Sequence, residues 1–139
     1  MNGGALHHIS IPVADVERSR AFYRGVLGLR EIERPPFDFP GAWFALGDGE
    51  LHLIGEPANP TFRAEKPLDS GDMHFAVRVE SYDEAVAELE SKGYRTDADG
   101  LHPQAMIARP HPVTGYPQIY ILDPDRHVIE INEAPRSRS

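Results

Sequence analysis

The sequence of 139 residues contains no cysteine, and this absence excludes disulfides, thiolate nucleophiles and thiolate metal ligands. It also lacks any apolar run close to the roughly 18 residues that a membrane-spanning helix needs. The N-terminus has neither the basic start nor the apolar middle of a secretory signal. We therefore expect a cytoplasmic protein with no membrane partner.

Positive charge is also scarce. Lys and Arg number 14 against 22 Asp and Glu, which gives a formal net charge of −8. Such a surface repels a phosphate backbone, and no clustered stripe of Lys and Arg offsets it. The sequence therefore predicts no nucleic-acid partner. Hydrophobic residues make up 40% of the chain, which is enough for the core of one domain or of two small fused modules.

One pattern of a strand, a helix and three strands occurs twice. Apolar residues alternate with others over 9–13, which is the period of a half-buried strand, and Asp15 can cap the helix that follows. The second copy opens in the same way and carries a capping box at 81–84. The two openings align at an offset of 66 residues, which places His8 on His74. We interpret this alignment as an internal duplication.

The fold class predicted from this pattern is α+β, with two tandem βαβββ modules that form an open, curved mixed sheet. The first module spans 1–56, a proline-containing linker spans 57–71, and the second module spans 72–139. A second proline-containing segment, 97–116, is predicted as a long loop, of the kind that either covers a functional site or is disordered. The strands predicted after the two helices are 29–33, 42–46, 50–54, 94–96, 118–122 and 127–132.

Candidate metal ligands lie on four predicted strands: His8, His52, His74 and Glu130. Neighbours in a strand point to opposite faces, so each of these side chains is predicted to lie opposite the apolar residues beside it. A lone polar residue on that face usually contacts water, so the prediction depends on the joint placement of the four. A curved sheet would gather three imidazoles and one carboxylate around a cavity. Such a donor set suits one divalent ion, Zn, Ni, Mn or Fe.

The segment 7–23, HHISIPVADVERSRAFY, resembles the opening of the vicinal oxygen chelate superfamily. This group includes glyoxalase I, bleomycin-resistance proteins, extradiol dioxygenases, fosfomycin-resistance proteins and methylmalonyl-CoA epimerase. The segment 120–131, YILDPDRHVIEI, is similar to the closing hairpin of the family. The resemblance implies a pair of βαβββ modules with metal ligands on their first and last strands.

The resemblance extends to individual ligand positions. It places His8 and His74 on the first-strand ligands and Glu130 on the last-strand carboxylate. His52 falls where glyoxalase I commonly has a glutamate and the epimerase a glutamine, and this departure argues against a simple glyoxalase I assignment. At Arg126 the closing hairpin of the family usually has glycine, a departure that we expect to affect only the turn.

Three functions remain open. The first is a metal-dependent lyase or isomerase, in which a small substrate chelates the metal through vicinal oxygens and Glu130 moves the proton, as the resemblance implies. The second is an Fe(II) extradiol-type dioxygenase that uses His8, His74 and Glu130 as its two-histidine, one-carboxylate set. The third is a non-enzymatic, dimeric small-molecule (antibiotic) binding protein with an aromatic-lined groove. The aromatic residues that could line such a groove are Phe37, Phe39, Trp43, Phe44 and Tyr116.

Further residues are candidates for the substrate pocket: Ser10, Arg78, Arg109 and His111. The family resemblance also implies a homodimer, because members commonly dimerise and share the site between chains. In that arrangement the two first-module ligands of one chain would meet the two second-module ligands of its partner. The sequence leaves open whether the site lies within one chain or across two.

Overall fold

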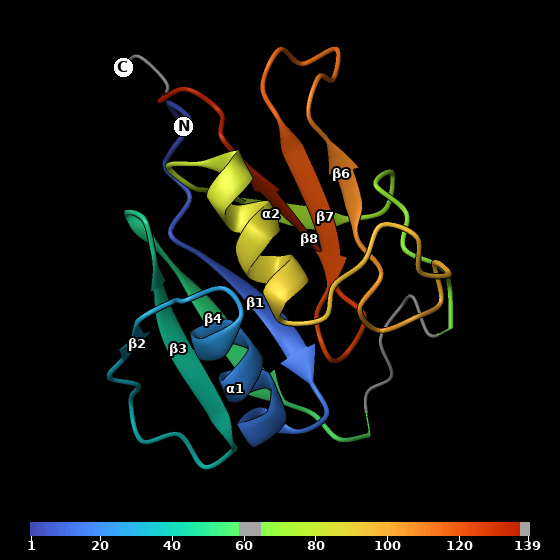
Figure 1. Cartoon of the computed structure of the whole chain (residues 1–139). Coiled ribbons are helices and arrows are strands. Elements are labelled where there is room, and N and C mark those ends of the chain that lie inside the picture. Colours follow the sequence, from blue (N-terminus) through green and yellow to red (C-terminus); the bar gives the residue numbers. More distant parts are fainter. Residues whose placement is uncertain (59–64, 137–139) are drawn as a thin grey trace. The chain divides into compact units, whose positions relative to one another are not determined.

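The computed structural model describes residues 1–58 and 65–136. The chain divides into two compact units, Met1–Phe62 and Arg63–Ser139. Each unit has the order strand, helix and three strands, as Figure 1 shows. This confirms the α+β class and the pair of βαβββ modules. The module bounds and the linker stay predictions, and residues 59–64 of that linker lie outside the described residues.

The first unit contains β1 His8–Val13, α1 Val16–Gly25, β2 Glu31–Ile32, β3 Gly41–Leu46 and β4 Gly49–Gly55. Its sheet has the strand order β1-β4-β3-β2. β1 and β4 are parallel, and the other two pairs are antiparallel. The sheet is therefore mixed and open, with the first and the last strand of the unit side by side.

α1 begins where the sequence predicts. The carboxylate of Asp15 accepts a hydrogen bond from the backbone N–H of Arg18 at 3.1 Å, which satisfies one of the donors that the first turn leaves unpaired. The helix packs on β3 and β4 through its buried side chains. Among these, Tyr23 is fully buried, with its ring centroid 6.0 Å from that of Phe44. Gly28 then turns the chain towards β2 at φ +67°, a conformation that glycine adopts without strain.

The second unit contains β5 His74–Arg78, α2 Tyr82–Ser91, β6 Ile107–Arg109, β7 Gln118–Leu122 and β8 Val128–Asn132. Its strand order, β5-β8-β7-β6, repeats that of the first unit, with β5 and β8 parallel. α2 starts and ends 66 residues after α1, and Ser81 caps it by accepting from the N–H of Glu84 at 3.2 Å. Both faces of β7 and β8 are buried.

Two predictions in the second unit are wrong. The predicted loop 97–116 contains β6, a three-residue edge strand paired with β7. Three residues between proline-rich turns are too short for a strand period to be recognised in the sequence. The strand predicted at 94–96 is only an isolated bridge between Arg95 and Ala105.

Arg126 contacts more than the turn in which it lies, although its effect was expected to be limited to that turn. Its backbone has φ +68°, the left-handed region in which the glycine of the family pattern is comfortable. Its guanidinium donates to the carbonyl oxygen of Lys66 at 2.7 Å and to that of Leu101 at 3.2 Å. The arginine therefore ties two loops of its unit to the β7–β8 turn.

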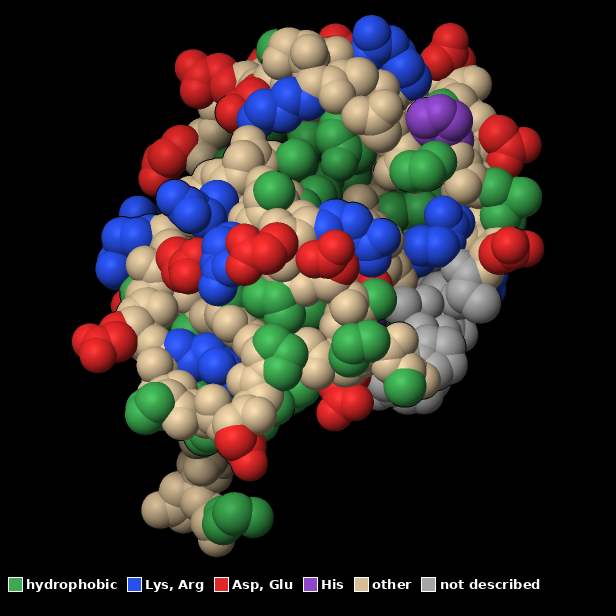
Figure 2. Space-filling view, turned by 90° about the horizontal axis from the view of Figure 1, so that it is seen from below, with side chains coloured by type: hydrophobic (Ala, Val, Ile, Leu, Met, Phe, Trp, Pro, Cys, Tyr) green, Lys and Arg blue, Asp and Glu red, His purple; other side chains and the backbone are tan. Residues whose placement is uncertain are grey.

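Charged side chains of both signs are interspersed on the face that Figure 2 presents. Within the described ranges 1–58 and 65–136, no helix is long and apolar enough to cross a membrane.

Candidate functional site

In the first unit, the candidate ligands lie on the sheet face opposite the core. Ser10 on β1 pairs with His52 on β4, so His8, Ser10 and His52 share one face. The flanking Leu51 and Leu53 are buried on the other face, where α1 packs. Strand alternation therefore places the two imidazoles of this unit together.

The imidazole of His52 is held on three sides. Its ring stacks on that of His8, with centroids 4.1 Å apart, and on the indole of Trp43, at 3.8 Å and nearly parallel. Its Nε2 lies 2.9 Å from Oε1 of Glu50, two residues earlier on the same strand face. Only 7% of His52 is exposed. The ring is thus contacted on both faces and at Nε2.

In the second unit, His74 and Glu130 face each other across β5 and β8. His74 Nε2 lies 3.5 Å from Glu130 Oε1. On the other side of the ring, His74 Nδ1 lies 2.6 Å from the backbone carbonyl of Asp72. A carbonyl can only accept, so Nδ1 carries a proton, and Nε2 is the nitrogen on which a metal ion would bind. Nε2 is on the side of the carboxylate.

Glu130 is 6% exposed and is surrounded by donors. Its Oε1 accepts from the Tyr120 hydroxyl at 2.7 Å and from the Gln118 amide at 3.3 Å, and its Oε2 accepts from the Asn132 amide at 2.5 Å. Burial raises the pKa of Tyr120 to about 12, and the hydrogen bond to Glu130 and the charge of that carboxylate add to the effect. The phenol therefore stays protonated and keeps donating over the physiological pH range.

The two pairs occupy equivalent positions in their units. His52 pairs with the residue two places after His8, and Glu130 pairs with the residue two places after His74. An aromatic side chain pairs with each of them on the third strand, Trp43 in one unit and Tyr120 in the other. Each unit thus contributes one imidazole from its first strand and one candidate ligand from its last.

The chemistry of these donors fits a divalent metal ion. Each candidate imidazole has an outer partner on one nitrogen: His7 for His8, at 2.7 Å, and the Glu50 and Asp72 contacts described above. Metal-binding histidines normally show this arrangement, because the outer partner fixes the ring and its tautomer. The second nitrogen of each ring is then left for a metal.

The geometry adds a condition to this fit. In the part of the chain that the structure describes, no three His, Asp or Glu side chains are gathered closely enough to hold a metal ion. The four candidates form two pairs, one in each unit, and neither pair alone supplies three ligands. Imidazole lone pairs lie in the ring plane, and the His8 and His52 rings are stacked within 17° of parallel. One of these rings must therefore rotate before both bind one ion.

The candidate pocket residues lie in different surroundings. Ser10 shares the face of His52, and Arg78 pairs with Asn132 and so shares the face of Glu130. The guanidinium of Arg109 lies 5.5 Å from the centroid of the Tyr120 ring. His111 lies in the exposed segment after β6.

Four residues that contact the candidate ligands were not predicted from the sequence: Glu50, Gln118, Tyr120 and Asn132. Glu50 and Asn132 lie two residues from a candidate ligand on the same strand, so strand period alone could have found them. Gln118 and Tyr120 required the register between β7 and β8, which no sequence pattern gives.

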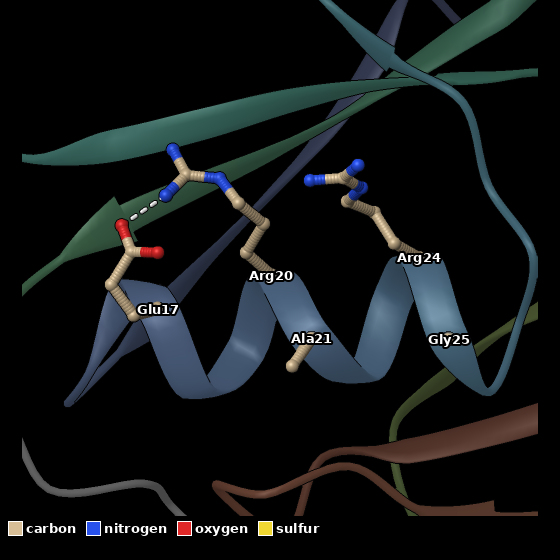
Figure 3. Close-up of a pocket in the computed structure, with 5 residues that line it drawn as sticks. All are labelled: Glu17, Arg20, Ala21, Arg24 and Gly25. Carbon is tan, nitrogen blue, oxygen red and sulfur yellow. Dashed lines mark hydrogen bonds and ion pairs between the residues drawn. The ribbon is translucent and has the colours of Figure 1, made fainter.

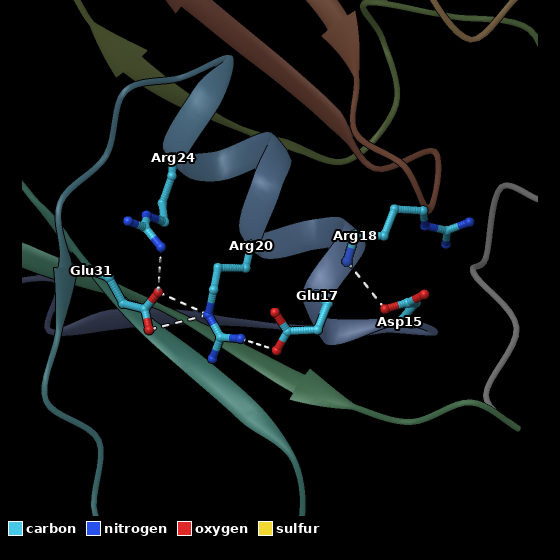
Figure 4. A network of polar contacts seen from close by, with 6 residues as sticks. All are labelled: Asp15, Glu17, Arg18, Arg20, Arg24 and Glu31. Atoms are coloured by element: carbon cyan, nitrogen blue, oxygen red, sulfur yellow. Dashed lines mark hydrogen bonds and ion pairs between the residues drawn. The ribbon is translucent and has the colours of Figure 1, made fainter.

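A separate surface depression lies along α1, with a volume of about 310 Å³. Figure 3 shows its lining residues, among them Arg20, Arg24 and Glu17. Arg20 donates to Glu17 and, at 2.9 and 3.2 Å, to both oxygens of Glu31, and Arg24 lies 4.0 Å from Glu31 (Figure 4). The hydrogen bond to Glu17 contributes most to the raised pKa of Arg20. The pairs with Glu31 attach α1 to β2. Because the charges of Arg20 and Arg24 are paired with carboxylates, we assign the depression a structural role.

The family model described as "Glyoxalase/Bleomycin resistance protein/Dioxygenase superfamily" matches residues 5–131. The chain belongs to this superfamily. A glyoxalase family protein from Bacillus anthracis has a crystal structure that superposes with a TM-score of 0.71 at 26% identity, covering 97% of this chain and 98% of that one.

Two sequence relatives are similar to this chain over most of its length. The uncharacterized protein YwkD of Bacillus subtilis is 32% identical over 133 residues, which cover 93% of this chain and 96% of that protein. The mitochondrial methylmalonyl-CoA epimerase of the mouse is 30% identical over 114 residues, 75% of this chain. The match covers only 64% of the mouse enzyme.

Proposed function

We propose that the protein is a metal-dependent lyase or isomerase that binds a small substrate through vicinal oxygens and moves a proton with Glu130. The observation that carries this proposal is the Glu130 carboxylate itself. It is buried, held by three donors, and faced at 3.5 Å by Nε2 of His74. The 30% identity to a methylmalonyl-CoA epimerase supports an isomerase.

His8, His52, His74 and Glu130 are the residues that would hold the metal ion. When bound, a divalent ion supplies Lewis acidity towards the substrate oxygens. The chain itself orients the donors. Asp72 and Glu50 fix the rings of His74 and His52, and Tyr120, Gln118 and Asn132 fix the carboxylate. Such fixed partners reduce the reorganisation that proton transfer requires.

We further propose that the working form is a cytoplasmic homodimer. The proposal follows from the division of the candidate ligands into two pairs, since a partner chain can supply the pair that completes a site. Light scattering of the purified chain tests it directly. A monomer that binds metal at one ion per chain would place the whole site within a single chain.

A run of rings in the first unit favours the non-enzymatic alternative, a small-molecule binding protein. Phe39 stacks on Phe37 at 5.1 Å, Phe37 lies 6.2 Å from Trp43, and Trp43 stacks on His52. Phe37 and Phe39 are 46% and 40% exposed, so an aromatic ligand has access to them. This surface also suits an enzyme with an aromatic substrate, and proton exchange separates the two functions.

The test uses untagged, full-length protein and two readouts. Elemental analysis compares metal content in the wild type, His52→Gln and Glu130→Gln, with the exposed Glu33→Gln as the charge-matched control. Proton exchange into deuterium oxide is then followed by NMR at the carbon next to the carbonyl of 2-hydroxy carbonyl compounds and acyl thioesters. We expect Glu130→Gln to slow exchange by about 10²–10⁴-fold, the usual contribution of a general base, and Glu33→Gln to leave it unchanged.

Two results would contradict the proposal. Metal content that both His52→Gln and Glu130→Gln leave unchanged would remove these residues from the metal site. Bound metal without exchange of any substrate of these two classes would favour the binding protein.

A further inference from the structure

A row of four polar side chains crosses the sheet of the second unit beside Glu130. Arg109 on β6 pairs with Gln118 on β7, which pairs with Asn132 on β8, which pairs with Arg78 on β5. Residues paired in this way share one face of the sheet. The row is the neighbour of the one that contains Glu130 and Tyr120, because these lie two residues along β8 and β7.

The centre and the ends of this row differ in role. Gln118 and Asn132 are each 7% exposed and donate their amides to Glu130, so the centre of the row is occupied in holding that carboxylate. Arg78 and Arg109 are exposed, and they lie on the two edge strands of the sheet. The row therefore offers two guanidinium groups on either side of a fixed neutral centre.

The two arginines retain their capacity to donate. Over residues 1–58 and 65–136, neither of them has a carboxylate partner. The guanidinium carbon of Arg109 lies over the ring of Tyr120, 5.5 Å from its centroid, and with no carboxylate partner among the described residues its N–H groups are left for an oxyanion. Tyr120 in turn donates to Glu130, so the guanidinium is kept close to the proposed proton-transfer group.

The charge of the chain makes this row selective. With a formal net charge of −8, the protein repels small anions in general. An anionic substrate that approaches Glu130 needs local positive charge, and this row supplies it at the neighbouring register position. Arginine is also the side chain best suited to bind a planar carboxylate or a phosphoryl group through paired N–H donors.

We propose that the substrate carries a compact oxyanion, a carboxylate or a phosphoryl group, that Arg109 and Arg78 bind while Glu130 acts on the neighbouring part of the molecule. This assignment of a substrate class rests on the proposed function of Glu130. The oxyanion subsite itself is a property of the row and is measurable without turnover.

The experiment is calorimetric binding of succinate to the purified full-length protein, with the neutral succinamide as the matched ligand. Arg109→Gln and Arg78→Gln each remove one guanidinium. Arg136→Gln removes the same charge from an exposed arginine of the same unit whose ion pair is with Glu80 at 3.8 Å. We expect succinate to bind, and each row variant to weaken it about five- to ten-fold, the effect of losing one charge-assisted hydrogen bond at an exposed site. We expect Arg136→Gln and succinamide to show no comparable effect.

A second ligand and a further variant identify the anion and separate this proposal from the preceding one. Inorganic phosphate that binds more tightly than succinate, with the same loss in the row variants, supports the subsite and identifies a phosphoryl group as its anion. His8→Ala removes a candidate metal ligand on the other unit. Succinate binding that survives His8→Ala but weakens in the row variants supports the subsite, whatever the metal result.

The opposite results would overturn the oxyanion subsite. Equal binding of succinate and succinamide would show that charge is not recognised. Equal losses in Arg136→Gln and the row variants would assign the effect to overall charge. Binding that disappears with His8→Ala and is unchanged by Arg109→Gln and Arg78→Gln would assign the anion to the metal.

Discussion

Replacement of Arg126 separates two opposing contributions to the stability of the second unit. The residue has a left-handed backbone, which costs a non-glycine residue about 1–2 kcal/mol. Its guanidinium makes two hydrogen bonds to loop carbonyls, of Lys66 and Leu101. Each such bond contributes about 1 kcal/mol net to folding. The bonds therefore offset the backbone cost.

Different substitutions remove these contributions separately. Arg126→Ala loses both hydrogen bonds and keeps the left-handed cost, so we expect a loss of about 2 kcal/mol. Arg126→Gly loses the same bonds but relieves the backbone cost. About 0.4–1 kcal/mol of this gain is offset because glycine makes the unfolded chain more flexible. We expect the glycine variant to be less stable than the wild type by about 1 kcal/mol and more stable than the alanine variant.

Urea unfolding, followed by circular dichroism, gives the order of the three proteins. In thermal unfolding, a difference of 1 kcal/mol corresponds to roughly 4 °C in a chain of this size. If the alanine variant lay within 0.5 kcal/mol of the wild type, which is the range of a neutral surface substitution, the hydrogen bonds of the arginine would not stabilise the two loops. Equal stability of the alanine and glycine variants would show that the left-handed backbone at position 126 carries no cost.

Three further predictions concern single side chains. Trp43 is the sole tryptophan and stacks on His52, so metal that rotates this ring should change the emission of Trp43; His52→Gln should abolish the change seen in a Zn²⁺ titration. Tyr120 has a raised pKa of about 12, so the stability that its protonated hydroxyl adds is complete below pH 10 and lost between pH 10 and 12. The stability difference between wild type and Tyr120→Phe should be constant below pH 10 and shrink above it, while absorbance at 295 nm shows one tyrosine fewer titrating near pH 12. Arg20→Met should cost about 1 kcal/mol in urea unfolding because it breaks the link from α1 to β2, whereas the more exposed Arg24→Met should cost less than 0.5.

The sequence predicts the fold well because its signals are local. Alternation in the first strands, the caps Asp15 and Ser81 and the 66-residue offset all involve residues close to one another or repeated in the same order. The same signals place each candidate ligand opposite the core face of its strand. β6 was missed because it is short, lies at an edge and depends on β7 for its hydrogen bonds.

The surroundings of the candidate ligands depend on contacts between strands, and these are not local. The register of β7 against β8 brings the Tyr120 hydroxyl to Glu130, and the register of β3 against β4 places Trp43 over His52. A shift of either register by one residue would turn these side chains to the opposite face. Position on a strand is thus readable from the sequence, whereas the partner across the sheet is not.

The histidine at position 52, unusual beside glyoxalase I, is consistent with its surroundings. Each unit has one carboxylate at or beside the candidate ligand of its last strand. In the second unit this carboxylate is Glu130 itself, and neutral amides and a phenol hold it. In the first unit the carboxylate is Glu50, and it holds His52. A glutamate at position 52 would put a second negative charge on the same strand face as Glu50, about 7 Å away along the strand, where like charges repel. An imidazole at that position instead gains a hydrogen bond to Glu50, so the carboxylate of Glu50 accounts for a histidine rather than a glutamate at position 52.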